Sequence, residues 1–496
     1  MSRRLLAPLV VAALVAGGTT AASRSWPVLP REPRPIMPTS VPVAERNLVC
    51  PDLSGVPGRT VTRVTVAALP GPDGAGVAEL SGLGDGFPAP LPRLAGTAAA
   101  AGAVAQTDVA VPSGPARLAA RGPLAARVAA EQVTRSDGGP ARGLAETRCA
   151  AAAAERWFVG GSTGVGAAAT LLLVNPDDVP ATADVGLLTP GGPVTPRSAQ
   201  GIEVPARGSV RLALDTLAPN AAALVTHVVV RAGRLASTVL DSRHRADLPL
   251  GVDYLPPAAA AAATVVVPGL PAGPGVRRVY LAAPGTDDAT VELRVVSTEG
   301  TFVPDALNAI RVPAGTVVPV DLGNVLAGRP ASVVATSDVP VLAGGFASAV
   351  DPRTGVGEFA WTGATAPLSG SALLPDNRTR DAVDSVLLLS APGAAATVLV
   401  TALPGGAGPV AGPFPVQVPA GHTIVVALHA LDIPPGSFAL AVTPATDSGP
   451  VYAARVLVEL GSRGLLLSTL SLERTETTVT VPAVVPDPAA GTAGTP

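Results

Sequence analysis

A repeat of about 107 residues most constrains what this 496-residue chain can fold into. A lead-in segment marked by Val159 returns at Val267, Leu374 and Val481. Two further landmarks return with nearly the same spacing: Asn175-Pro176 as Ala283-Pro284 and Ala391-Pro392, and Val204-Pro205-Ala206 as Val312-Pro313-Ala314 and Val418-Pro419-Ala420. A fixed period of this length indicates a tandem array of one structural building block.

Within each repeat, short apolar segments alternate with polar residues at a period of two. Val291, Leu293 and Val295 alternate with polar neighbours in this way, which is typical of a half-buried strand. The segments are separated by Asn-Pro, Ala-Pro-Gly and Pro-Gly-Gly turns. We therefore predict an all-β fold of tandem immunoglobulin-like antiparallel β-sandwich units, about four in number, with a shortened first unit.

The chain is too long for one hydrophobic core, so it should divide into domains. The predicted order is a signal peptide or signal anchor (1–22), a Pro-rich linker (23–46), a shortened β unit with the cysteine pair (47–150), three β-sandwich repeats (151–262, 263–370 and 371–483) and a disordered tail (484–496). The shortened unit is expected to lack part of the middle of the repeat. Residues 477–481 are expected to complete the fourth unit or to cap the edge of the array.

The first 22 residues have the pattern of a secretory signal. Arg3 and Arg4 precede an apolar run over 5–16, and small residues follow it. The apolar run is short for a membrane span, which needs about 20 residues. An uncleaved anchor with the same outward orientation remains the alternative. In either case the body of the protein is predicted to be extracytoplasmic, with the N-terminal segment as its only membrane contact.

The composition excludes several functional classes. The net charge is −3 and only 14% of residues are charged, so no nucleic-acid partner is expected. The sequence contains no lysine, which excludes a P-loop lysine and a Schiff-base lysine. We expect no cofactor. The oligomeric state does not follow from these features.

Cys50 and Cys149 are the two cysteines, and both flank the first predicted unit. An even number of cysteines in an exported chain favours a disulfide. The alternative is two unrelated buried thiols.

Candidate catalytic and metal-binding residues are weak. Ser162, in Gly160-Gly161-Ser162-Thr163-Gly164, matches the G-x-S-x-G pattern of hydrolases, but a second strand follows soon afterwards where a nucleophile elbow needs a helix. We therefore interpret this segment as a turn. The four histidines (His227, His244, His422 and His429) do not have the spacing of a zinc site. Asp177-Asp178 and Asp287-Asp288 are expected in exposed turns.

Three aromatic residues are placed near the predicted junctions between units: Trp157, Tyr254 and Trp361. They could stack on glycans, but their recurrence at junctions favours packing between neighbouring units, because aromatic side chains bury large areas.

The mature chain resembles an actinobacterial family of exported proteins catalogued only as a domain of unknown function (5719-like). The features that carry the likeness are Cys50-Pro51, Arg142-Gly143-Leu144 with Cys149, Trp157-Phe158, Val204-Pro205-Ala206, Pro268-Gly269, and Gly449-Pro450 with Ala453-Ala454-Arg455. The repeats also resemble β-sandwich repeats of bacterial surface proteins. The resemblance implies an envelope location and a two-cysteine first unit, and it supplies no catalytic residue or ligand.

The sequence therefore predicts a non-enzymatic cell-envelope protein, secreted or anchored, that serves as a spacer or interaction scaffold. Its expected partners are cell-wall glycan or envelope proteins. One alternative is a module that binds wall glycan, or an accessory subunit of a polysaccharide-assembly enzyme. A hydrolase that uses Ser162 is a third hypothesis.

Overall fold

The computed structural model describes residues 38–51, 60–71, 76–83, 93–95, 102–109, 114–136, 138–139, 141–380, 383–405, 408–461 and 463–481. The predicted export segment 1–22, most of the linker 23–46 and the tail 484–496 lie outside the described residues. The chain divides into two compact units, of which the larger covers residues 43–477 and the smaller combines the two terminal segments.

In the smaller unit, strand β1 (Thr39–Pro42) pairs antiparallel with strand β35 (Thr478–Val481). The fourth lead-in segment of the repeat, marked by Val481, is therefore part of a separate two-stranded sheet. It does not complete the fourth repeat, because its ladder partner is the segment that contains Thr39. β1 (Thr39–Pro42) lies within the segment 23–46 that the sequence predicts to be a linker, so part of that segment forms a strand.

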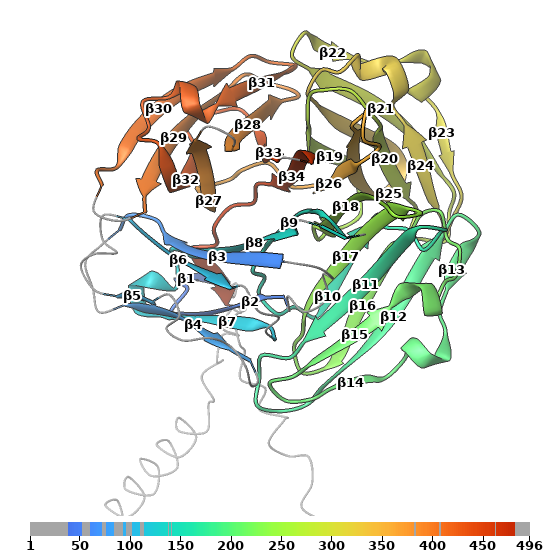
Figure 1. The fold of residues 1–496 in the computed structure, drawn as a ribbon, viewed down its shortest axis with the longest axis horizontal. Coiled ribbons are helices and arrows are strands. Elements are labelled where there is room, and N and C mark those ends of the chain that lie inside the picture. Colours follow the sequence, from blue (N-terminus) through green and yellow to red (C-terminus); the bar gives the residue numbers. More distant parts are fainter. Residues whose placement is uncertain are drawn as a thin grey trace, which may run out of the picture. The chain divides into compact units, whose positions relative to one another are not determined.

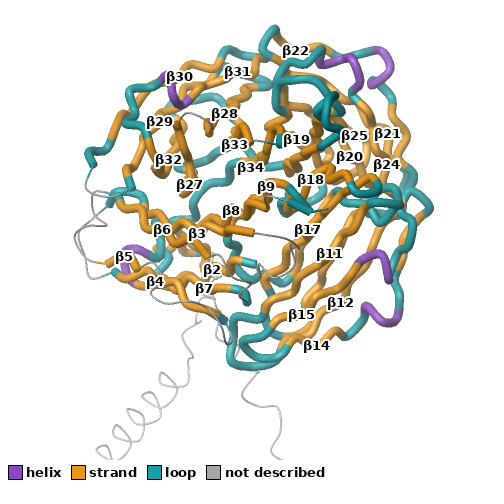
Figure 2. The backbone as a smooth tube through the Cα atoms, in the orientation of Figure 1, coloured by secondary structure: helices purple, strands orange, loops and turns teal. Residues whose placement is uncertain are grey.

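The prediction of an all-β fold built from antiparallel sheets is confirmed. Strands make up 63% of the structure, and the longest helical segment among the described residues is the 3-10 helix η6, with 4 residues. Figure 2 shows strands filling most of the traced chain, with the short helices in the connections. These helices are η2 (Gly122–Leu124), η3 (Arg197–Ala199), η4 (Leu214–Thr216), η5 (Asp305–Leu307), η6 (Gly323–Leu326) and η7 (Leu428–Ala430). No helix in the described part of the chain is long and apolar enough to cross a bilayer.

One order of strand pairing recurs along the 43–477 unit, in four segments that we call modules I to IV. In each module, the first strand, which is the lead-in strand, belongs to one sheet. The last two strands of the module are hydrogen-bonded neighbours at the edge of a second sheet. Module I has the sheets β2-β7-β4-β5 and β6-β3-β8-β9, although the sequence predicts that part of its middle is missing. Its strands are β2 (Glu45–Cys50), β3 (Thr60–Ala68), β4 (Val77–Gly82), β5 (Arg93–Ala95), β6 (Ala103–Val109), β7 (Ala116–Arg121), β8 (Val128–Ser136) and β9 (Gly143–Arg148).

Module II has the sheets β10-β16-β12-β13, with β14 also on β12, and β15-β11-β17-β18. Its strands are β10 (Glu155–Val159), β11 (Ala167–Val174), β12 (Ala181–Thr189), β13 (Gly192–Val194), β14 (Ile202–Val204), β15 (Ser209–Ala213), β16 (Val225–Ala232), β17 (Ala236–Arg245) and β18 (Leu248–Leu255).

In module III, the 20-residue strand β25 passes from one sheet to the other, so the two sheets are continuous. Its N-terminal part pairs with β19 and β21, and its C-terminal part pairs with β20 and β26. The strands are β19 (Ala262–Leu270), β20 (Arg277–Ala282), β21 (Ala289–Ser297), β22 (Gly300–Phe302), β23 (Ile310–Val312), β24 (Val317–Asp321), β25 (Ala331–Val350) and β26 (Gly357–Gly363).

In module IV, a short pairing between the first two strands joins the two sheets. The strands are β27 (Ala372–Arg380), β28 (Val383–Ala391), β29 (Ala396–Pro404), β30 (Ala411–Val418), β31 (His422–Ala427), β32 (Gly436–Pro444), β33 (Tyr452–Gly461) and β34 (Gly464–Ser471).

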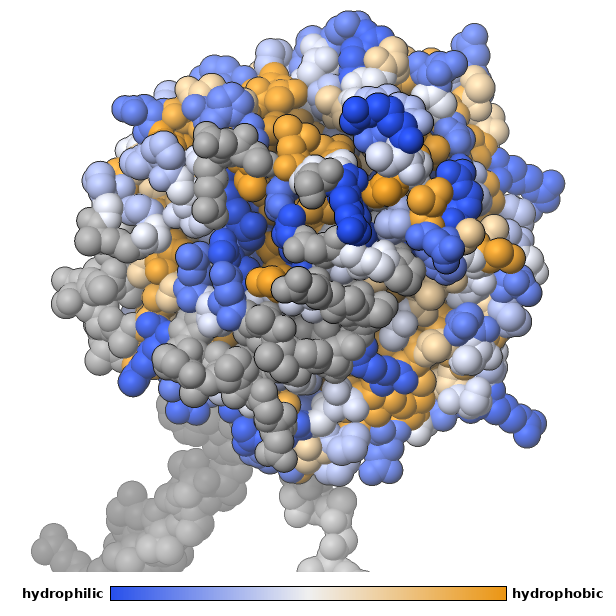
Figure 3. Space-filling view, in the orientation of Figure 1, coloured by the Kyte–Doolittle hydropathy of each residue, from blue (hydrophilic) through white to orange (hydrophobic). Residues whose placement is uncertain are grey.

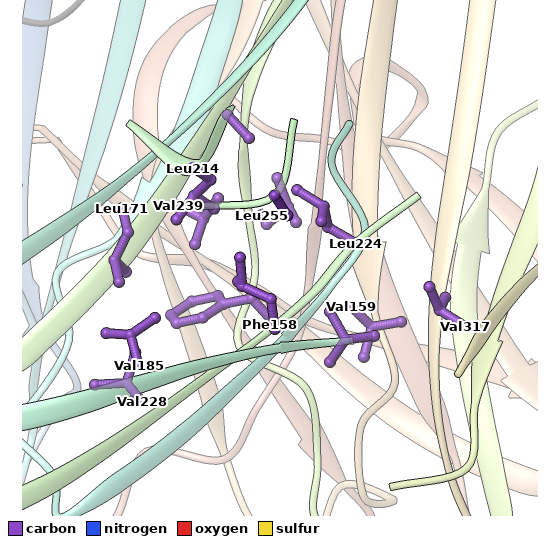
Figure 4. Packing of buried hydrophobic residues seen from close by; sticks show 14 of the residues in the cluster. Phe158, Val159, Leu171, Val185, Leu214, Leu224, Val228, Val239, Leu255 and Val317 are labelled. Carbon is purple, nitrogen blue, oxygen red and sulfur yellow. The ribbon is translucent and has the colours of Figure 1, made fainter. Parts of the chain in front are cut away.

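The hydrophobic cores follow the repeat, and each module contains one main cluster of buried apolar side chains. Strand β21 illustrates the cause. Val291, Leu293 and Val295 are fully buried, whereas Thr290, Glu292 and Arg294, which alternate with them, are exposed or half-exposed, as the sequence pattern predicts. The core of module II continues into module III. Val317 of β24 belongs to the same cluster as Phe158 and Val159 of β10 (Figure 4).

The final strands of the modules meet one another inside the 43–477 unit. β9 contacts β18, β18 contacts β26, β26 contacts β34, and β34 contacts β9. The labels of these four strands lie close together near the middle of the unit in Figure 1. The modules are therefore packed around a closed circuit of inner strands. β26 is buried along its whole length, and β9, β18 and β34 are buried except for one to three residues at one end.

Candidate functional site

Asp253 of β18 lies where all four modules meet. Its Oδ2 accepts a hydrogen bond from the backbone N–H of Trp361 in module III, at 2.8 Å. Its Oδ1 accepts from the backbone N–H of Glu146 in module I, at 3.1 Å, and from the hydroxyl of Ser468 in module IV, at 3.2 Å. Burial raises the pKa of Asp253 well above its usual range, although the hydrogen bonds from the backbone of Trp361 and Glu146 oppose the shift. One fully buried carboxyl group thus joins the inner strands of all four modules.

A charge cluster connects modules I and IV next to this point. The guanidinium of Arg455 on β33 donates to Oε1 of Glu131 on β8 at 2.5 Å and forms a second ion pair with Glu146 on β9. All three side chains have zero exposure. Arg455 also donates to the backbone carbonyl of Asp376. Because Ala130 belongs to the core of module I, strand alternation directs its neighbour Glu131 to the opposite face, towards module IV.

The charges in this cluster do not balance, because two carboxylates face one guanidinium. Burial raises the pKa of Glu131 to about 7, and the neighbouring Glu146 and Asp376 add to the shift while Arg455 opposes it. Burial also raises the pKa of Glu146. Burial alone would lower the pKa of Arg455, but the two glutamates outweigh it and raise that pKa. The cluster therefore takes up a proton readily near neutral pH while the arginine stays charged.

Modules II and III are joined by an aromatic and charged cluster. Asp241 on β17 accepts hydrogen bonds of 3.0 Å from Nε1 of Trp361 and from Nε of Arg243. The guanidinium of Arg243 lies 4.5 Å from the ring centre of Phe346 and 5.1 Å from that of Phe359. A planar cation held over aromatic faces and paired with a buried carboxylate is a favourable arrangement.

A cavity of about 220 Å³ lies between modules I, II and IV, and Glu146 of the Arg455 cluster is part of its lining. Four arginines line it: Arg46, Arg148, Arg156 and Arg474. The hydroxyl residues Ser237 and Thr469 and the ring of Tyr254 also contribute to its wall. This cavity adjoins the disulfide, because Cys149 is part of its lining.

The predicted disulfide between Cys50 and Cys149 is present and closes a sequence separation of 99 residues. It joins the end of β2 to the residue that follows β9, so it connects the two sheets of module I.

Ser162 lies in a turn. Its hydroxyl donates to the carbonyl of Ala221 at 3.0 Å and accepts from the N–H of Gly164 at 3.1 Å. Gly160 and Gly161 both have positive φ, and a Cβ at Gly160 would overlap the ring of Trp361. The glycines of this motif are therefore explained by backbone conformation and close packing, and Ser162 by the hydrogen bonds of the turn.

The four histidines lie apart in the structure. His227 pairs with Glu155 at 2.7 Å and His429 with Asp384 at 2.6 Å, while the rings of His244 and His422 contact nearby backbone carbonyls. Within the described ranges, no group of three or more His, Cys, Asp and Glu side chains is placed to hold a metal ion.

The acidic pairs lie at turns. Asp177 pairs with Arg234 at 2.8 Å and Asp288 with Arg311 at 2.6 Å.

Two of the three junction aromatics pack between modules. Trp361 is 1% exposed and bonds to Asp241 and Asp253 of module II, and the hydroxyl of the buried Tyr254 lies 3.2 Å from Nε2 of Gln132 in module I. Trp157 differs from them, because it is half-buried and stacks within its own module on His227, with ring centres 3.6 Å apart.

Sequence reasoning missed the buried charged residues Glu131, Glu146, Asp253 and Arg455. Glu131 and Glu146 lie in strands of mixed composition and give no signal in the sequence. A signal exists for Asp253 and Arg455, since each interrupts a predominantly apolar strand. A charged side chain in such a position must find partners when it is buried.

A comparison with protein-family models matches residues 99–429 to a family described as a family of unknown function (DUF5719). No curated protein matches the chain.

Proposed function

The chain belongs to this family of unknown function, and we propose that it is a non-enzymatic, extracytoplasmic scaffold of the cell envelope whose four modules form one rigid platform. The proposal of export rests on the signal-like segment 1–22 and on the disulfide, because disulfides persist in oxidising compartments.

The observation that carries the scaffold proposal is the set of hydrogen bonds around Asp253. A single carboxyl group that bonds to three other modules fixes the modules in one mutual orientation. The Asp253 carboxyl group and the clusters around Arg455 and Arg243 are all buried ionisable groups, and all of them lie at interfaces between modules. This arrangement favours a rigid platform over an extended spacer. Modules that pack around a closed circuit of strands do not form a longer molecule in the way that modules joined end to end would.

The outer surface of the platform suits contact with other envelope components. Hydrophilic and hydrophobic residues are interspersed over the face shown in Figure 3. Exposed ion pairs such as Arg207 with Asp178 contribute little to stability, so such surface positions are free to vary with the partner.

A complementation experiment tests the proposal. A strain that lacks the protein is expected to show an envelope defect, which the wild-type chain and the Ser162→Ala variant restore equally. Arg455→Met leaves Glu131 and Glu146 buried without their cation, a change that costs about 3–5 kcal/mol in comparable sites. We expect this variant to loosen the joint between modules I and IV and to lose the restoring effect.

Small-angle X-ray scattering of the purified variants provides the control, because it measures whether the modules have separated. Loss of function in Ser162→Ala with unchanged scattering would favour a hydrolase and contradict the scaffold. Full function in an Arg455→Met variant with expanded scattering would show that rigid joints are not needed.

A further inference from the structure

The cavity between modules I, II and IV is lined by more cationic than anionic groups. Arg46 on β2, Arg148 on β9, Arg156 on β10 and Arg474 after β34 contribute to its wall. The acidic lining residues are Glu146, Glu473 and Glu476, and Glu146 is already paired with Arg455.

Two of these arginines have unmet hydrogen-bonding capacity. Nε of Arg46 and Nε of Arg148 are buried and have no hydrogen-bond partner in the described part of the chain. A terminal nitrogen of Arg46 donates to the backbone carbonyl of Glu476. Among the described residues, the terminal nitrogens of Arg148 donate to the carbonyls of Leu373 and Ser471, both at 3.4 Å. A guanidinium carries five N–H donors in a planar fork, so each of these side chains has donors to spare.

The electrostatic environment agrees with this geometry. Burial lowers the pKa of Arg148, and the carboxylates of Glu473, Glu131 and Glu146 only partly oppose the shift. Burial also lowers the pKa of Arg46. Both groups are therefore short of compensating negative charge, and an anion within reach would supply it.

The remaining wall is polar and compact. The hydroxyl residues Ser237 and Thr469 are 8% and 3% exposed, and their oxygens have no hydrogen-bond partner among the described residues. The volume of about 220 Å³ is below the range of about 300–1,000 Å³ that is usual for drug-sized ligands. A ligand there must be small, or must insert only one end.

We propose that this cavity is a binding site for a small oxyanion group, a carboxylate or a phosphate, carried by a sugar-sized ligand or by the end of a longer one. The arginines would bind the oxyanion, because a guanidinium matches carboxylate and phosphate oxygens in geometry and charge. Modules I, II and IV each contribute lining residues, so the site exists only when these modules are assembled. This inference goes beyond the proposed scaffold and does not depend on it.

Isothermal titration of the full exported chain with D-glucuronate, glucose 1-phosphate, inorganic phosphate and glucose tests the proposal. We expect binding of the anions, with glucose as the neutral control that does not bind. Glucuronate and glucose 1-phosphate separate a carboxylate preference from a phosphate preference. Binding of glucose as tight as that of the anions, or the absence of binding by every anion, would overturn the proposal.

Variants locate the binding. Arg148→Gln should weaken anion binding about tenfold or more, since a charge-assisted hydrogen bond is lost. Arg474→Gln changes an exposed side chain at the cavity, so it keeps the test valid if Arg148→Gln does not fold. The matched control is Arg311→Gln, which alters an exposed arginine of module III that does not line the cavity. Affinities of Arg148→Gln and Arg474→Gln equal to that of the control would contradict the site.

Discussion

The carboxyl group of Asp253 accepts a 2.8 Å hydrogen bond from the backbone N–H of Trp361, 108 residues further along the chain. Because 108 residues is the spacing of the repeat, this bond links corresponding regions of neighbouring modules. The same carboxyl group reaches back to Glu146 and forward to Ser468. The Asp253 carboxyl group therefore links its own module to the other three.

Replacing Asp253 with alanine should destabilise the protein by about 3 kcal/mol or more. The change leaves two buried N–H groups and one hydroxyl without their acceptor, and each unsatisfied group costs about 1–3 kcal/mol. Urea unfolding followed by circular dichroism measures the loss. Asp338→Ala is the matched control, because Asp338 also accepts a 2.8 Å bond from a backbone N–H, that of Thr290, but at an exposed site. Equal losses in the two variants would contradict the central role of Asp253.

Stability should increase as the pH falls from 8 to 5.5. Burial raises the pKa of Glu131 from its ordinary 4.5 to about 7, so between these values the folded state binds more protons than the unfolded chain. The free energy of unfolding therefore rises as the pH falls through this window and declines as the pH rises through it. The raised pKa values of Asp253 and Glu358 act in the same direction.

Thermal unfolding across this pH range tests that expectation. Glu131→Gln removes the titrating group, so its Tm should depend less on pH than that of the wild type. The control Glu292→Gln changes an exposed glutamate of β21 and should retain the wild-type slope. If Glu131→Gln also retained the full slope, the proton would have to be assigned to another group.

The sequence predicts the strands far better than it predicts this centre. Alternation in Val291, Leu293 and Val295 determines which face of β21 is buried, and the structure confirms it. Alternation also indicates that Glu131 lies on the face opposite Ala130. It cannot identify Arg455 as the partner of Glu131, because the two are 324 positions apart and meet only through the packing of modules I and IV. The 107-residue period predicts that the chain contains modules. The interfaces between the modules depend on side chains that differ from one module to the next.

Removing the disulfide should lower stability by about 2–4 kcal/mol. Cys50 and Cys149 close a separation of 99 residues, and a cross-link of this span restricts the unfolded chain strongly. Chemical denaturation of the Cys50→Ala/Cys149→Ala variant, with and without reductant, provides the measurement. Reductant should destabilise the wild type and leave the variant unchanged. A wild type that is insensitive to full reduction would show that module I holds together without the bond.

In the G-x-S-x-G segment, Gly160→Ala should destabilise the protein more than Gly192→Ala does at a turn elsewhere in module II. Both glycines have positive φ, of 134° and 120°, so alanine incurs a similar backbone cost of about 1–2 kcal/mol at each position. At Gly192 a Cβ would meet open space, whereas at Gly160 it would overlap the ring of Trp361 in module III. Overpacking of this kind adds about 1–3 kcal/mol.

The difference between these two variants isolates the close approach of modules II and III from the local turn. Urea midpoints give the two free energies, and near-ultraviolet circular dichroism reports whether the environment of Trp361 has changed. Gly160→Ala should alter the aromatic signal and Gly192→Ala should not. Equal midpoints and unchanged spectra would mean that the modules can separate here without cost. The expected inequality would instead show that the glycine of this hydrolase-like motif is required by the packing between modules.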